Sequence, residues 1–390
     1  MPKTLESDAL AAIAELRDPL GVLSIYVDAD PERQSTDRPP WAVAVKDGLR
    51  DLLHRTKEEG PRERWAALKE RVDDMEAEIA ETLATATSGR GRVLFAGIES
   101  GATRRMTLQM PLETRVVLED GPYLRPLVAA LDAGRSTGIV NVSRSGVEVH
   151  EWRLGAAREV EEAEFQDRSD RDREKKGPAA AIPARGQQTA PQHDRHEQTI
   201  DDRRHRFLAS MADRVGALAA ERRWSLVLVT GDPRVGPSLL DRLSLEDGVE
   251  VVPVWRAFEG RPAHEVADAL MDEIRAAAAR RRGRLVERVE GESGATVGLA
   301  PTLFALHERR VAELLYDEGR DHRGARLPDG RLVPEPEAGA AGAEGATSEP
   351  RLVERMIEAA LAGGADVVPL TGDEAARVSP HDGVAALLRW

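Results

Sequence analysis

The clearest pattern in the chain is an apolar stripe within residues 194–224. Apolar side chains recur there at spacings of three, four and seven, which predicts one face of a long α-helix; they are Ile200, Phe207, Leu208, Met211, Val215 and Leu218. Arginines lie off this stripe, namely Arg195, Arg203, Arg204 and Arg206. After Trp224, the apolar run 225–230 predicts a buried strand, and the sequence Gly-Asp-Pro at 231–233 predicts a turn.

The N-terminal third has patterns of a mixed α/β domain, which we place at residues 1–133. Short apolar runs predict strands over 20–27, 92–97, 107–110 and 115–118. Amphipathic stretches predict helices over 41–57 and 61–87, the second with Pro61 at a tolerated position in its first turn.

A second domain is predicted over residues 134–258. Two strands, 137–142 and 147–154, flank a Ser-Arg-Ser-Gly turn and predict a hairpin. Residues 166–192 lack apolar periodicity and are rich in charge, alanine and proline, so we expect a mobile loop before the long helix. After that helix, the segments 225–230, 237–243 and 249–254 predict a strand–helix–strand unit with parallel strands.

The remaining residues, 261–390, predict a third domain that alternates helices and strands. Helices are expected over 264–282, 297–310 and 351–362, and strands over 311–316, 366–370 and from Val384 to the end. The segment 319–349 is rich in Gly, Pro, Ala and acidic residues and predicts a disordered insertion. The fold class is therefore α/β (α+β) with three domains.

Composition narrows the class of protein. The absence of cysteine excludes disulfides and cysteine-ligated zinc. No apolar signal core stands at the start, and no run approaches the ~18 apolar residues of a membrane span. We therefore expect a cytoplasmic protein that is not a membrane protein.

The distribution of charge favours local contacts with RNA in spite of a net charge of −14. Residues 166–206 hold ten basic and eight acidic side chains, and a second basic cluster includes Arg280, Arg281 and Arg282. Basic patches on an acidic body can bind RNA while the body stays soluble. The alternative, that these arginines are solvated helix faces, stays open on charge alone.

The loop, the helix and the strand together resemble the middle domain of the archaeo-eukaryotic release factor and Pelota superfamily. The residues that carry the resemblance are the Arg185-Gly186-Gln187-Gln188 tip, the long basic helix and the strand that ends in Gly-Asp-Pro. The C-terminal passages 363–370 and 382–390 resemble the superfamily's third domain, which shares its fold with kink-turn RNA-binding ribosomal proteins. The N-terminal domain resembles the superfamily only weakly.

This resemblance implies a factor that binds the ribosome, with rRNA and tRNA as partners, and places the loop in the A site. Family members with a Gly-Gly-Gln tip promote peptidyl-tRNA hydrolysis there, which makes Gln187, Gly186 and Gln188 the candidate catalytic residues and Arg185 a candidate RNA contact. Arg185 replaces one glycine of that tip, and an arginine lacks the backbone freedom of glycine. The Asn-Ile-Lys-Ser motif of stop-codon readers is absent, since Asn141 is the only asparagine.

Three functional classes stay open on the sequence. One is a rescue or release factor that hydrolyses peptidyl-tRNA, and another is a non-catalytic hibernation or quality-control factor resembling Balon. The third is an α/β protein unrelated to translation. Elongation factor Tu or another translational GTPase is a candidate partner, and we expect a monomer.

No cofactor or metal is expected. His193 and His196 lie three residues apart, but the neighbouring arginines would repel a cation. Gly231 and Gly236 have the spacing of a phosphate loop, but Pro237 stands where the lysine should be, so we predict no nucleotide site.

Overall fold

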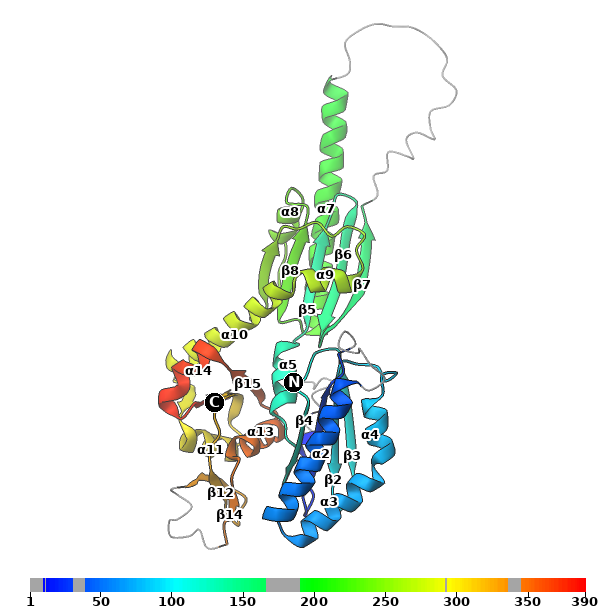
Figure 1. The fold of residues 1–390 in the computed structure, drawn as a ribbon. Helices are drawn as coiled ribbons and strands as arrows, with labels where there is room; N and C mark the ends of the chain where they lie inside the picture. Colours follow the sequence, from blue (N-terminus) through cyan, green and yellow to red (C-terminus); the bar gives the residue numbers. More distant parts are fainter. Residues whose placement is uncertain (1–9, 11, 31–38, 166–189, 292, 336–344) are drawn as a thin grey trace. The chain divides into compact units, whose positions relative to one another are not determined.

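The computed structural model describes residues 10, 12–30, 39–165, 190–291, 293–335 and 345–390, with the backbone alone over 190–199 (Figure 1). The chain divides into two compact units. Residues 135–277 form one unit, and residues 1–134 together with 278–390 form the other. The division into three domains, with boundaries near 133 and 258–261, stays a prediction.

The unit of residues 135–277 contains a five-stranded sheet with the order β7-β6-β5-β8-β9. Strands β5, β6 and β7 pair antiparallel, whereas β5, β8 and β9 are parallel, which confirms the expected parallel strand–helix–strand unit. The strands are β5 (Thr137–Val142), β6 (Gly146–Arg153), β7 (Ala156–Glu164), β8 (Leu226–Gly231) and β9 (Glu250–Val254). Strand β7 was not anticipated from the sequence.

Helices cover both faces of this sheet (Figure 1). The long helix α7 (Ala190–Arg222) packs its apolar stripe on one face, where Leu208, Val215 and Leu218 are buried against valines of β5, β6 and β8. The stripe predicted from the sequence is thus confirmed for the part of α7 whose side chains are described. Helix α8 (Gly236–Leu240) joins the same core, and α9 (Ala263–Ala269) contacts β6 and β7.

A buried carboxylate fixes the end of α7 to the sheet. Glu151 of β6 accepts hydrogen bonds from Ser136 Oγ (2.9 Å) and Trp224 Nε1 (3.1 Å) at Oε1, and from Arg158 Nε (2.9 Å) at Oε2. These hydrogen bonds outweigh burial and hold the pKa of Glu151 below its ordinary value. The Trp224 ring lies so close to Gly138 that a Cβ there would be 2.2 Å from a ring carbon. The contact explains why β5 has glycine at this position.

The other unit begins with an antiparallel four-stranded sheet of order β3-β2-β1-β4, covered by helices on one face. Its strands are β1 (Val22–Asp28), β2 (Gly91–Gly97), β3 (Thr103–Leu108) and β4 (Arg115–Glu119). Its helices are α2 (Pro40–Glu59), α3 (Arg62–Asp74) and α4 (Glu76–Leu83). One helix was expected over 61–87, but the structure has two, α3 and α4, which are separated at Met75. The Met75 side chain is fully buried in the core between the helices and the sheet.

A second sheet of this unit has the order β10-β16-β11-β15, with β11 and β15 parallel. Its strands are β10 (Ala295–Val297), β11 (Val311–Asp317), β15 (Asp366–Leu370) and β16 (Val384–Leu388). Around it lie α5 (Arg125–Ala133), the C-terminal part of α10 (Met271–Gly291), α11 (Leu299–His307), α13 (Leu352–Ala362) and α14 (Gly372–Val378). Helices α5 and α14 were not anticipated, whereas α11, α13 and all but β10 of these strands match the expected segments.

The expectation of disorder over 319–349 is wrong for part of this segment. Nine of its residues form a three-stranded antiparallel sheet of order β13-β12-β14, from β12 (Gly324–Arg326), β13 (Leu332–Pro334) and β14 (Thr347–Glu349). Ala325 and Glu349 are buried, and Arg326 Nε donates to Glu349 Oε1 at 2.9 Å. Strands of three residues carry too little periodicity to be detected in a sequence rich in Gly and Pro.

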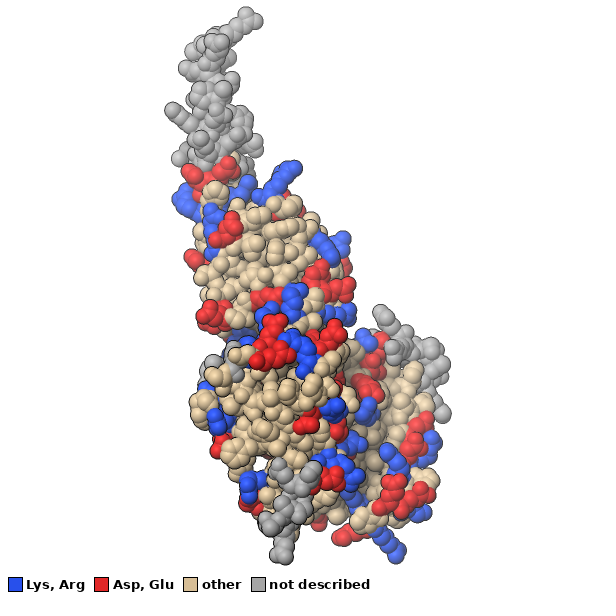
Figure 2. All heavy atoms as spheres, turned by 90° about the vertical axis from the view of Figure 1, so that its left-hand side faces the viewer, with Lys and Arg blue, Asp and Glu red and all other residues tan. Residues whose placement is uncertain are grey.

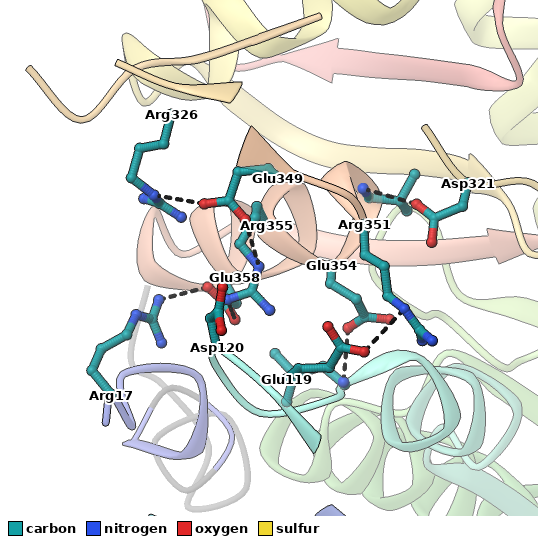
Figure 3. Close-up of polar contacts among 12 residues, drawn as sticks. Arg17, Glu119, Asp120, Asp321, Arg326, Glu349, Arg351, Glu354, Arg355 and Glu358 are labelled. Atoms are coloured by element: carbon teal, nitrogen blue, oxygen red, sulfur yellow. Dashed lines mark hydrogen bonds and ion pairs between the residues drawn. The ribbon is translucent and has the colours of Figure 1, made fainter. Parts of the chain in front are cut away.

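Helix α13 buries a charged face (Figure 3). Glu354, Arg355 and Glu358 are at most 4% exposed. Arg125 Nε lies 3.1 Å from Glu354 Oε1, and Glu358 pairs with Arg17 Nη2 (2.6 Å) and Arg355 Nη1 (2.7 Å). The pairs with Arg125 and Arg17 join elements more than 200 residues apart in the sequence, from the N-terminal third and from α13.

We expect these glutamates to make the stability of this unit fall as pH rises from 5 to 8. Burial outweighs the neighbouring arginines and raises the pKa of Glu354 and of Glu358 to about 7. The folded protein then holds protons that the unfolded chain has already released, so raising the pH through this window favours unfolding. Urea midpoints measured at pH 5 and pH 8 check this.

Glu358→Gln should reduce that difference between pH 5 and pH 8, because the amide does not titrate. Glu290→Gln is the matched control, since the pKa of the exposed Glu290 is lowered by a hydrogen bond from Arg377 and lies outside the window. Equal pH dependence in wild type and Glu358→Gln would contradict the assignment.

Candidate functional site

The predicted functional loop has both of its ends in the unit of residues 135–277. Residues 166–189 lie outside the described part of the chain, and with them Arg185, Gly186, Gln187 and Gln188. The described flanks are Phe165, which follows β7, and Ala190, where α7 begins. These two flanking residues, which we call the root of the loop, are the described residues nearest to the predicted site.

Phe165 fixes the first end of the loop. Its backbone N–H donates to the carbonyl oxygen of Ser145 at 2.6 Å. Its ring packs against Phe207 of α7, with centroids 5.7 Å apart, and the Arg204 guanidinium lies over the Phe165 ring, 5.1 Å from its centroid. Stacking and cation–π contacts of this kind hold the chain against the helix just where the described residues end.

An ion pair joins β7 and α7 further along. Arg214 Nε lies 2.6 Å from Glu161 Oε2, and both side chains are partly exposed. The strand before the loop and the helix after it are thus connected at two levels, by Phe165 with Phe207 and by Glu161 with Arg214. A loop that starts and ends on connected elements has a defined base, which is how proteins position functional loops.

The turn at 231–233 lies at the same end of the sheet as the loop root. Gly231 has φ +113°, and a Cβ there would be 2.0 Å from Val142 O, so this position requires glycine. Asp232 accepts from the Arg234 N–H (2.8 Å) and pairs with Arg144 Nε (3.1 Å) of the β5–β6 turn. These are the carboxyl ends of the parallel strands β5 and β8, the edge where open α/β sheets bind ligands.

The arginines of α7 differ in their surroundings. Arg204 is half-buried over Phe165 and therefore has a structural contact. Arg206 is exposed, with Nε donating to Asp202 O at 3.3 Å, and Arg203 is half-exposed. The side chain of Arg195 lies outside the described residues. Arg203 and Arg206 are thus the described arginines of this group best placed to contact an external anion.

The second basic cluster is largely engaged within the fold. Arg281 Nη1 lies 2.8 Å from Asp132 Oδ1, and Arg282 pairs with Asp132 (3.7 Å) and Glu374 (3.6 Å). Both side chains are about four-fifths buried, whereas Arg280 is exposed. A role of Arg280, Arg281 and Arg282 in RNA binding stays a prediction.

The surface charge is mixed on the face drawn in Figure 2. Basic and acidic side chains alternate over the described residues of that face, and they do not merge into one basic field. Within the described residues no three His, Asp or Glu side chains are grouped to hold a metal, and no helix is long and apolar enough to span a membrane. The side chains of His193 and His196 lie outside this range.

Sequence reasoning missed the residues that form the root of the loop. Phe165 follows a strand dominated by glutamates, and nothing in its local pattern marks it as a partner of Phe207. An isolated aromatic residue at the boundary of a charged loop was the only signal available.

Comparisons with known proteins find matches to the part of the chain that contains the loop and its flanking elements. The model of bacterial archaeo-eukaryotic release factor family 10 matches residues 122–286, which include the whole five-stranded sheet, the loop and α7. The uncharacterized protein YocB of Bacillus subtilis (strain 168) is 24% identical over 222 residues, which are 56% of this chain and 80% of that protein.

Solved structures of the superfamily are also similar. Archaeoglobus fulgidus Pelota is 15% identical, with 77% of this chain and 79% of that chain covered and a TM-score of 0.32. The archaeal translation termination factor aRF1 is 17% identical, with 98% and 97% covered and a TM-score of 0.25. The family match covers less than half of the chain, and it makes residues 122–286 similar to bacterial archaeo-eukaryotic release factor family 10.

Proposed function

We propose that this protein is a translation factor that binds the ribosomal A site and acts in rescue or release. The observation that carries the proposal is the family match over residues 122–286, because it covers the loop and both elements from which the loop arises. In the proposal, α7 and β7 form the base that positions the loop, and the ribosome is the partner through rRNA and tRNA.

Contact with RNA is assigned to two arginines of α7, the exposed Arg206 and the half-exposed Arg203, and to Arg185 in the loop. Arginine pairs with phosphate oxygens through a planar fork of donors, so a few exposed guanidiniums can fix the register of the protein on RNA. Arg203 and Arg206 lie on the helix that continues directly from the loop. Binding through them does not require a basic protein as a whole.

The proposed chemistry is hydrolysis of the peptidyl-tRNA ester, with Gln187 as the residue that helps to position water. A neutral amide can orient a nucleophile without titrating, and positioning alone can supply several kcal/mol of the barrier. Gly186 supplies the backbone freedom of the tip, and Gln188 is the other residue that can occupy the active position.

A second candidate function is hibernation or quality control, in which the loop occupies the A site without chemistry. The observation that favours it is Arg185, which replaces a glycine of the Gly-Gly-Gln tip. Delivery by a translational GTPase such as elongation factor Tu is compatible with both functions.

Ribosome binding should depend on Arg203 and Arg206. We expect the double variant Arg203→Ala/Arg206→Ala to co-sediment less with ribosomes at ~100 mM salt and to lower the salt slope by about two, because two phosphates are no longer neutralised. Arg204 is left in place because it packs on Phe165.

The matched control is Arg50→Ala/Arg55→Ala, which removes the same charge from the exposed face of α2. If both double variants weaken binding equally, a general charge effect explains the loss. If neither variant changes binding, α7 does not contact the ribosome and the proposal in this form is wrong.

A further inference from the structure

The unit of residues 1–134 and 278–390 contains a cavity that the proposed function does not use. It has a volume of about 180 Å³ and lies between α11, α13 and the β12–β13 hairpin, with Arg17 at its rim. Part of its wall is drawn in Figure 3, where Arg17, Arg326, Arg355 and Glu358 lie around the N-terminal and central turns of α13.

Most of the charged side chains in the wall are basic. Four arginines line the cavity, and His307 adds an imidazole; the arginines are Arg17, Arg326, Arg331 and Arg355. Glu358 is the one acidic side chain among the described lining residues. Burial raises the pKa of Glu358 to about 7, so near neutral pH this carboxyl carries less than a full negative charge.

Two of the arginines form ion pairs with Glu358. Arg355, 4% exposed, places Nη1 2.7 Å from Glu358 Oε1, and Arg17 Nη2 lies 2.6 Å from Oε2. One carboxylate therefore faces two guanidiniums. Arg355 Nε also lies 3.8 Å from Glu349 Oε2, so Glu349, which is outside the lining residues, offsets part of the positive charge on this side of the cavity.

Arg326 and Arg331 keep donors for a ligand. Each uses Nε for a carboxylate of the fold, Arg326 for Glu349 at 2.9 Å and Arg331 for Asp329 at 2.6 Å. Within the described residues, the Nη atoms of both arginines have no hydrogen-bonded partner. An Nε-anchored guanidinium has a fixed orientation and still presents N–H groups to an anion.

The remaining wall is apolar. Leu303 and Leu306 of α11 are buried, and Leu332 of β13 with Ala359 and Ala362 of α13 complete this side. A site with an apolar wall opposite a few convergent polar groups is typical of small-molecule binding. Its volume is smaller than the ~300 Å³ lower range of drug-sized sites, so the ligand must be small.

We propose that this cavity binds a small phosphate monoester, with the phosphate between Arg326 and Arg331 and a compact apolar group against Leu303, Leu306 and Leu332. A dianionic phosphate matches the guanidiniums and the imidazole that line the cavity better than a singly charged carboxylate does. The cavity is formed by residues of the other unit, and the proposal neither requires nor tests ribosome binding.

Isothermal titration calorimetry on the full chain tests the proposal with phenyl phosphate as the probe. Wild type should bind phenyl phosphate, bind inorganic phosphate at least tenfold more weakly, and show no heat with phenol. Arg331→Ala, at a half-exposed position paired with the adjacent Asp329, should weaken phenyl phosphate binding at least tenfold without unfolding the protein. Arg323→Ala is the control, because Arg323 lies before the same small sheet, outside the cavity, and is 69% exposed.

Three outcomes would overturn the proposal. The first is no binding of phenyl phosphate to folded wild type, and the second is equal weakening by Arg331→Ala and Arg323→Ala. The third is equal affinity for phenyl phosphate and inorganic phosphate, which would remove the apolar group from the ligand. Circular dichroism melts of each variant establish that it is folded before titration.

Discussion

Gln187→Ala should abolish peptide release, lowering the rate by about two orders of magnitude or more, if the loop performs chemistry. The assay incubates the protein with ribosomes that carry peptidyl-tRNA in the P site and have an empty A site. Positioning of water tolerates little displacement, so the loss of the amide removes most of the rate. Binding should persist, because one neutral side chain is a small part of a large RNA interface.

Gln188→Ala is the matched control, since it removes the same amide one residue further along the tip. Loss with Gln187→Ala alone assigns the active position, and loss with Gln188→Ala alone moves it by one residue. If wild type binds without releasing peptide, and neither variant differs from it, the loop does no chemistry. Hibernation or quality control by occupancy of the A site then becomes the better account.

The element pattern was predictable where long periodicities or buried apolar runs exist. The stripe of α7 and the runs of β1, β8, β11 and β15 are such cases, because burial of a whole face leaves a repeated signal in the sequence. Strand β7 was missed for the opposite reason. It is an edge strand whose nine residues include four glutamates, a composition that protects an edge from pairing and hides the strand.

For the candidate site, the sequence could predict which residues belong to it but not which contacts they make. The sequence marked the loop and the arginines around it, but not that Arg204 packs on Phe165 or that Arg281 and Arg282 pair with Asp132. Such pairings depend on residues 39 and about 150 positions away. Helix α13 shows the same limit, because Glu354 and Glu358 fit a solvated helix face until their partners on distant elements are known.

Arg125→Ala should destabilise the unit of residues 1–134 and 278–390 most strongly at pH 8, where Glu354, with a pKa of about 7, is largely ionised; breaking a buried ion pair usually costs about 3–5 kcal/mol. Arg125 Nε lies 3.1 Å from Glu354 Oε1 and Nη2 lies 3.0 Å from Asp321 Oδ2, and the guanidinium also stacks 5.9 Å from the Tyr316 ring centre. Glu354 is fully buried, so its ionised carboxylate depends on protein partners for stabilisation. Chemical unfolding followed by circular dichroism measures the loss of stability.

Two further variants separate the charge from the packing. Arg64→Ala removes the partner of the exposed Asp120 in the same unit, and we expect no more than about 1 kcal/mol from that pair. Adding Glu354→Gln to Arg125→Ala should recover part of the stability, because the amide carries no charge to bury and can still accept the Leu124 N–H that now bonds Oε2 at 2.9 Å. If the double variant is no more stable than Arg125→Ala, packing against Tyr316 is what Arg125 contributes, and the ion pair with α13 is not what holds these elements together.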